Sequence, residues 1–138
     1  MYTYRKQVSP NATTAASTSN FVIYELNINS IATYKMADVE VIASLSTVND
    51  PNNISTIYYR KLQIVDSTLS PDYTYYPINS SFNYAFATGI DADLYLSEIS
   101  YVQSGGGASN GNIQIKTTNP AATSRTGTCF VHFKINFF

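Results

Sequence analysis

The sequence predicts an all-β protein that folds as a single-domain antiparallel β-sandwich of about eight strands, arranged like a jelly roll. Two observations predict this fold. Apolar and polar residues alternate with a period of two along most of the chain, which is typical of strands with one buried face. Clusters of Asn, Asp, Gly, Pro and Ser separate the alternating segments. A jelly roll is favoured over an immunoglobulin sandwich because several strands are long and the chain has one Cys and no Trp.

The N-terminal residues 2–8 predict a short strand with Tyr2, Tyr4 and Val8 on one face. Residues 9–20 are polar and of low complexity, so we expect a linker. The chain is therefore divided into an arm and linker (residues 1–20) and a sandwich (residues 21–138). The arm either packs on its own subunit or is exchanged with a neighbouring subunit, and the length of the linker permits both.

The alternation then defines the other strands in order. Residues 22–28 alternate, with Ile23 on the face of Glu25 and Asn27, and residues 39–45 alternate except for Ile42 on the polar face. Residues 54–65 are partly apolar on both faces, as expected of a central strand, and a further strand follows at residues 78–86. In residues 92–102 the apolar face switches, which predicts a bulge near Ser97 and Glu98. Residues 112–117 predict a short strand, and residues 32–38 contain enough Ala, Met and Lys for a helix of one turn or more.

The C-terminal segment, residues 128–138, alternates most clearly. Its polar face carries Phe130 and Phe138 as exceptions. Its apolar face consists of Cys129, Val131, Phe133, Ile135 and Phe137. Turn-forming residues predict loops at residues 49–53, 66–72, 104–111 and 119–127. We expect contacts with partners at residues 49–53, 66–76 and 104–112, because binding residues are frequent on loops.

The composition excludes several classes of protein. Charged residues make up only 12% of the 138 residues, the net charge is -1, and the aromatic fraction is 14% with 12 Tyr. A basic nucleic-acid binder, a disordered tail and a charged coiled coil do not have this composition. The apolar runs are too short for a membrane-spanning helix, and the N-terminus lacks the apolar segment of a signal peptide. A surface solvated by hydroxyls and amides tolerates close subunit packing or contact with sugars.

No residue set predicts catalysis, so we expect a protein that is not an enzyme and has no cofactor. Cys129 and His132 lie at positions i and i+3 of a strand and therefore face opposite sides. Asp38 and Glu40 share a face, which is typical of a solvated strand. The chain has no cluster of Cys and His for zinc. Asp91 and Asp93 are weak candidates for calcium, with ordinary turn chemistry as the alternative.

Tyrosine is the clearest excess, and it supplies the candidate contact residues. Its rings offer apolar area and a hydroxyl at low entropic cost, and they are enriched in interfaces. The candidate contacts outside the arm are Tyr58, Tyr59, Tyr73, Tyr75, Tyr76, Gly105, Gly106 and Gly107. The three glycines lack the Lys of a phosphate-binding loop and suit a hairpin tip. Asn11, Asn53 and Asn79 match the glycosylation pattern, and the sequence leaves open whether they are modified.

These features predict a structural assembly subunit that packs through a tyrosine-rich, charge-poor surface. We expect a virion protein, such as a coat, turret, spike or tail component, or an extracellular filament subunit. Its partners would be copies of itself and other structural proteins, without nucleic acid or a membrane span. The alternative is a carbohydrate- or receptor-binding module that recognises a cell-surface glycan or receptor through Tyr73, Tyr75, Tyr76 and Asp91 or Asp93.

Overall fold

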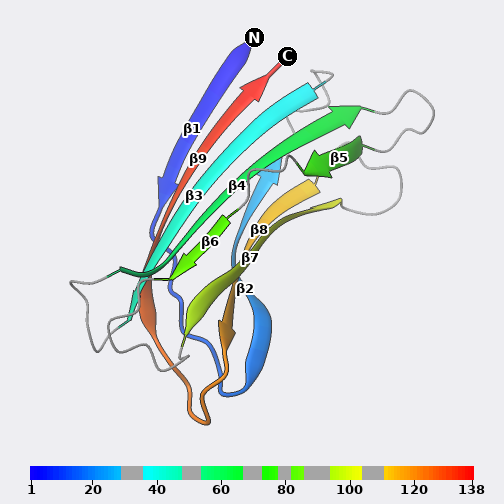
Figure 1. The fold of residues 1–138 in the computed structure, drawn as a ribbon. Coiled ribbons are helices and arrows are strands. Elements are labelled where there is room, and N and C mark those ends of the chain that lie inside the picture. Colours follow the sequence, from blue (N-terminus) through cyan, green and yellow to red (C-terminus); the bar gives the residue numbers. More distant parts are fainter. Residues whose placement is uncertain (29–35, 48–53, 67–72, 78–81, 86–93, 104–110) are drawn as a thin grey trace.

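Two antiparallel β-sheets pack face to face in the computed structural model (Figure 1). The structure describes residues 1–28, 36–47, 54–66, 73–77, 82–85, 94–103 and 111–138. Within these ranges there are nine strands. They are β1 (Tyr2–Val8), β2 (Thr18–Ile28), β3 (Met36–Thr47), β4 (Ile54–Asp66), β5 (Tyr73–Pro77), β6 (Phe82–Ala85), β7 (Tyr95–Gln103), β8 (Gly111–Asn119) and β9 (Gly127–Phe137). The predicted all-β sandwich is confirmed.

The larger sheet has six strands in the order β1-β9-β3-β4-β5, with β6 also paired to β4. The smaller sheet has the order β2-β8-β7. The first strand thus pairs with the last, and the second strand pairs with the last but one in the opposite sheet. These two outer pairs are nested as in a jelly roll, whereas β3, β4 and β5 pair in sequence order. The pairing of β1 with β9 places the two termini side by side at one end of the sandwich (Figure 1).

The core lies between the sheets and is made of the apolar faces that the alternation predicts. From the larger sheet, Val39, Val41 and Leu45 of β3 meet the apolar face of β9, and all three are at most 1% exposed. From the smaller sheet, Ile113 and Ile115 of β8 are fully buried. The register pairs Val41 with Phe133 and Leu45 with Cys129. Because paired residues on neighbouring strands point to the same side of a sheet, the apolar faces of β3 and β9 both point into the core.

Several predicted elements are confirmed in detail. The register between β7 and β8 shifts between Leu96 and Glu98, where the sequence predicts a bulge. β4 is central in its sheet, with β3 on one side and both β5 and β6 on the other. Met36 and the two residues after it belong to β3, so they are not helical. The rest of the possible helical turn, at residues 32–35, lies outside the described residues. The described part of the chain has no helix that is long and apolar enough to cross a membrane.

One strand was not predicted. β5 occupies residues 73–77, within the range that the sequence assigned to a contact loop. Its backbone pairs with β4, where Tyr75 stands opposite Ile64 and Tyr76 opposite Gln63. The segment is short, ends in Pro77 and shows no clear alternation, so its strand character comes from the long neighbouring strand that it pairs with. The expectation of a loop over residues 73–76 is therefore wrong.

The segment after β1, which the sequence predicts to be a linker, is packed on the sandwich. Ala12 and Thr14 are fully buried, and the Thr14 amide donates to the Arg125 carbonyl oxygen over 2.9 Å. Thr14 Oγ1 also lies 2.7 Å from Thr117 Oγ1 of β8. β2 begins at Thr18, so the expected boundary at residue 20 falls inside a strand. The polar residues of the segment find partners about a hundred residues away, which its composition alone does not show.

Asn119 holds this segment in place from the end of β8. Its side chain is fully buried. The amide nitrogen lies 3.0 Å from the carbonyl oxygens of Thr14 and Thr123 and 3.2 Å from that of Ala15. Its Oδ1 accepts a hydrogen bond from the Ala121 amide at 3.0 Å. One side chain therefore joins the N-terminal segment to the turn before β9.

Candidate functional site

The outer face of the larger sheet has two parts of different character. Towards the chain termini it carries a charged patch, which we define as Arg5, Asp38, Glu40, Lys61 and Lys134. The adjoining part carries a neutral patch, which we define as Gln7, Ile42, Ser44, Phe130 and His132. Both patches are built across β1, β9 and β3, with β4 adding Lys61 to the charged patch. Chain positions more than a hundred residues apart therefore form each surface.

Glu40 is the centre of the charged patch. It accepts a hydrogen bond from the Tyr59 hydroxyl at 3.0 Å. Its oxygens also lie 3.7 Å from Lys61 Nζ and 3.9 Å from Lys134 Nζ. Desolvation, and then the hydrogen bond to the Glu40 carboxylate and its charge, raise the pKa of Tyr59 above its usual value. These side chains are about one-third or more exposed, so the ion pairs add little stability and mainly orient the patch.

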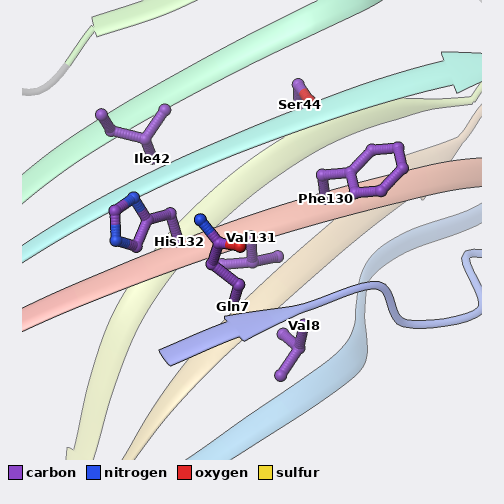
Figure 2. Close-up of a pocket in the computed structure, with 7 residues that line it drawn as sticks. All are labelled: Gln7, Val8, Ile42, Ser44, Phe130, Val131 and His132. Carbon is purple, nitrogen blue, oxygen red and sulfur yellow. The ribbon is translucent and has the colours of Figure 1, made fainter. Parts of the chain in front are cut away.

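The neutral patch surrounds a hollow of about 240 Å³ (Figure 2). Phe130 and His132 come from β9, Ile42 and Ser44 from β3, and Gln7 from β1. Phe130 is 60% exposed and Ile42 is 47% exposed, so both large apolar side chains are in contact with solvent. No carboxylate, ammonium or guanidinium group is among the residues that line it. Of the residues that line the hollow, the sequence predicted only Val8 as a contact, while Ile42 and Phe130 are among the exceptions in its alternation.

The predicted arm residues hold β1 against its own sheet. The Tyr2 ring stacks on Phe137 with 5.9 Å between centroids and an interplanar angle of 19°. Tyr4 and Val8 are half-buried and pack against the core. All three lie in register with β9. Within one chain they therefore serve to seat the edge strand.

The structure separates the predicted tyrosine pair. Tyr58 is only 8% exposed and belongs to the core, so its assignment as a surface contact is wrong. Tyr59 is half-buried on the outer face, beside Glu40. Successive strand residues point to opposite faces, so two adjacent tyrosines cannot both serve one surface.

The other predicted contact residues cannot be assigned to a site, because their side chains are not among those that the structure describes. Only backbone positions are described for Tyr73, Tyr75 and Tyr76, which lie on β5. Gly105, Gly106, Gly107, Asp91 and Asp93 lie outside the described residues, as do the residues 49–53. Their roles in contacts or in calcium binding stay predictions. Among the described residues, no three His, Cys, Asp or Glu side chains group as metal ligands.

Cys129 and His132 lie on opposite faces of β9, as the sequence predicts. Cys129 is fully buried in the core, whereas His132 lies in the neutral patch. Burial raises the pKa of the Cys129 thiol to about 12. The two side chains therefore do not form a nucleophile and base pair.

We expect the Cys129 thiol to be unreactive in the folded protein. At pH 8 an aromatic disulfide reagent should leave it unmodified, because the reactive thiolate is not formed and the core excludes the reagent. After unfolding in guanidinium the same reagent should titrate one thiol per chain. The raised pKa also predicts that stability falls as the pH rises from 9 towards 12, since the unfolded chain releases the proton first. Fast modification of the native protein would contradict this burial.

Comparisons with known proteins bear on the fold. No protein-family model matches the sequence, and no curated protein matches it. Among solved structures, the chain is similar to the tailspike protein of Acinetobacter baumannii phage AM24, with a TM-score of 0.50 and 9% sequence identity. The likeness covers 99% of this chain and 26% of the tailspike chain, so this chain spans about a quarter of that protein's length. At this identity the likeness concerns the fold alone.

Proposed function

We propose that the protein is a structural, non-enzymatic subunit of a virion assembly, such as a coat, turret, spike or tail component. The sandwich fold and its likeness to part of a phage tailspike support a role of this class. The low content of charged residues supports it as well, because neutral polar surfaces tolerate close packing of identical copies. An extracellular filament subunit would share these features.

The observation that carries the proposal is the way β1 is attached. Within the described part of the chain it is an edge strand that pairs with β9 alone, in a register of consecutive residues from Tyr2 to Val8. Directly after it, Asn11 bridges to Thr128 and Thr14 is buried, so the chain is anchored independently of β1. β1 could therefore leave β9 without unravelling the sandwich. An identical copy would offer the same register and the same half-buried contacts, which makes exchange between subunits inexpensive.

Pairing of β1 with β1 of a second copy is the less favourable way to use this edge. Arg5 and Lys6 stand at the middle of the strand. In an antiparallel β1–β1 pair centred there, like charges would face one another across the strands and oppose pairing. Exchange of β1 avoids this conflict because it restores the existing β1–β9 register.

A pair of engineered cysteines identifies the chain that supplies β1. Thr3 Oγ1 lies 2.8 Å from Asn136 Oδ1 across the β1–β9 register, and both side chains are solvent-accessible. In the double variant Thr3→Cys/Asn136→Cys a disulfide can form between these positions. Exchange predicts disulfide-linked dimers or ladders on a non-reducing gel, whereas an unexchanged strand gives a monomer band. The single variant Thr3→Cys measures the background of random linkage.

The solution mass tests the assembly itself. Light scattering should show a closed oligomer or a larger polymer, and removal of residues 1–10 should weaken it. An oligomer with only intramolecular disulfides would keep the assembly role and contradict exchange. A protein that stays monomeric at all concentrations, with or without residues 1–10, would contradict the proposed subunit.

A further inference from the structure

We propose that the hollow in the neutral patch is a binding site for an uncharged carbohydrate. The site lies on the outer face of the larger sheet, and it does not rest on the proposed assembly role. Three properties of its residues support this ligand class: an exposed aromatic ring, polar groups without a hydrogen-bond partner among the described residues, and a lining without charge.

The Phe130 ring is exposed and has only small neighbours on the two adjacent strands. Its partner on β3 is Ser44, which is too small to cover an aromatic ring. On the other side β1 ends at Val8, and the next residue, Ser9, directs its hydroxyl to the Cys129 carbonyl oxygen at 3.0 Å. The ring therefore stands 60% exposed between two serines. An exposed, fixed aromatic ring can stack against the C–H face of a pyranose and remove apolar surface from water.

The polar side chains around the ring are available to a ligand. Gln7, Ser44 and His132 line the hollow (Figure 2). Among the described residues, none of these three side chains has a hydrogen-bond partner. An amide, a hydroxyl and an imidazole together supply both donors and acceptors. Sugar hydroxyls also act as both, so they match this set better than a ligand that only accepts or only donates.

The absence of charge in the lining argues against other ligands. A phosphate, a carboxylate or a nucleic-acid strand would need Lys or Arg in the hollow, and none lines it. The basic residues Arg5 and Lys134 belong to the charged patch, and Lys134 lies near Glu40. A protein partner would be favoured by a flat apolar surface, whereas this surface is hollowed. The volume of about 240 Å³ is small for a ligand site and suits a single sugar ring of a chain that continues along the sheet.

The experiment uses an array of immobilised glycans and the full-length protein. The array should include neutral chains of hexoses and N-acetylhexosamines and acidic chains that contain sialic or uronic acids. We expect binding to neutral members. For the best neutral oligosaccharide, a titration followed by amide chemical shifts should move the signals of Gln7, Phe130 and His132 first.

Two variants and a matched control separate this site from general stickiness. Phe130→Ser should weaken binding by about tenfold or more, since it removes the stacking ring. Gln7→Ala should also weaken binding. Phe21→Ser replaces an aromatic side chain of similar exposure, 46%, on β2 of the other sheet, and should leave binding unchanged. All three should keep the wild-type melting temperature, because the replaced side chains are exposed.

Each of four results would overturn the proposal. These are no binding to any neutral glycan, binding only to acidic glycans, neutral binding that Phe130→Ser leaves intact, and a change in the solution mass with Phe130→Ser. The last result would assign the neutral patch to contacts between subunits. The proposed assembly role is tested separately, by the mass and by the cysteine pair on the charged end of the sheet.

Discussion

Replacement of Phe133 by alanine is expected to lower the free energy of unfolding by about 3–5 kcal/mol. Phe133 is among the largest fully buried side chains, at the middle of β9, which lies between β1 and β3. Its ring lies 5.9 Å from that of Tyr24 of the opposite sheet, so it joins the two layers of the sandwich. Alanine would remove the buried ring and leave a cavity that the neighbouring strands cannot close without breaking their register. Chemical denaturation measured by tyrosine fluorescence gives the change.

Phe130→Ala on the same strand is the matched control. The residue type and the strand are the same, but Phe130 is 60% exposed on the outer face. We therefore expect a change of about 0.5 kcal/mol or less. Similar losses from both variants would mean that β9 does not bury one face as described. A large loss from Phe130→Ala alone would place the neutral patch inside a subunit contact.

Replacement of Asn119 by alanine should cost about 2–4 kcal/mol and lower the melting temperature by about 10 °C. The amide group of Asn119 is fully buried. Its nitrogen donates hydrogen bonds to the carbonyl oxygens of Thr14, Ala15 and Thr123, and its oxygen accepts one from the Ala121 amide. Without this side chain, buried backbone groups lose partners that water cannot replace. The N-terminal segment should also loosen, so hydrogen exchange at the Thr14 and Ser17 amides should speed up more than exchange in β8.

Two further variants separate hydrogen bonding from volume. Asn119→Asp keeps the size of the side chain but loses the donor and sets a carboxylate against carbonyl oxygens, so it should destabilise at pH 7 at least as much as Asn119→Ala. Asn112 lies on β8, like Asn119, and its side chain accepts an exposed hydrogen bond from Asn27 of β2. Asn112→Ala removes this bond and should cost about 0.5 kcal/mol or less. If Asn119→Asp were as stable as the wild type, the amide would not be the anchor of the segment.

The alternation was sufficient to predict the sandwich and most of its core. The faces of β3 and β9 were predicted residue by residue, and even the bulge near Ser97 was visible as a change of face. These buried faces and the bulge can be recognised from residues only one or two positions apart in the sequence. Strand β5 was missed because Tyr73–Pro77 has no such local pattern and forms by pairing with β4.

The candidate site was visible in the sequence only as two irregularities. Ile42 and Phe130 broke the alternation, but nothing local showed that they would line one hollow together with Gln7 of β1. The tyrosine clusters pointed elsewhere, and Tyr58 proved to be a core residue. Likewise, the polar residues 9–17 had the composition of a linker, although Thr14 is buried against Thr117.

The class of fold, the strands with strong alternation and the face that each of them buries could all be inferred from the sequence. These are local properties, because side chains on a strand alternate regardless of the neighbouring strand. Only the folded chain shows which strands pair, that the first and last strands are neighbours, and which exceptions to the pattern form a common surface. Those outcomes depend on contacts between residues more than a hundred positions apart, such as Gln7 and His132, and no short-range pattern records them.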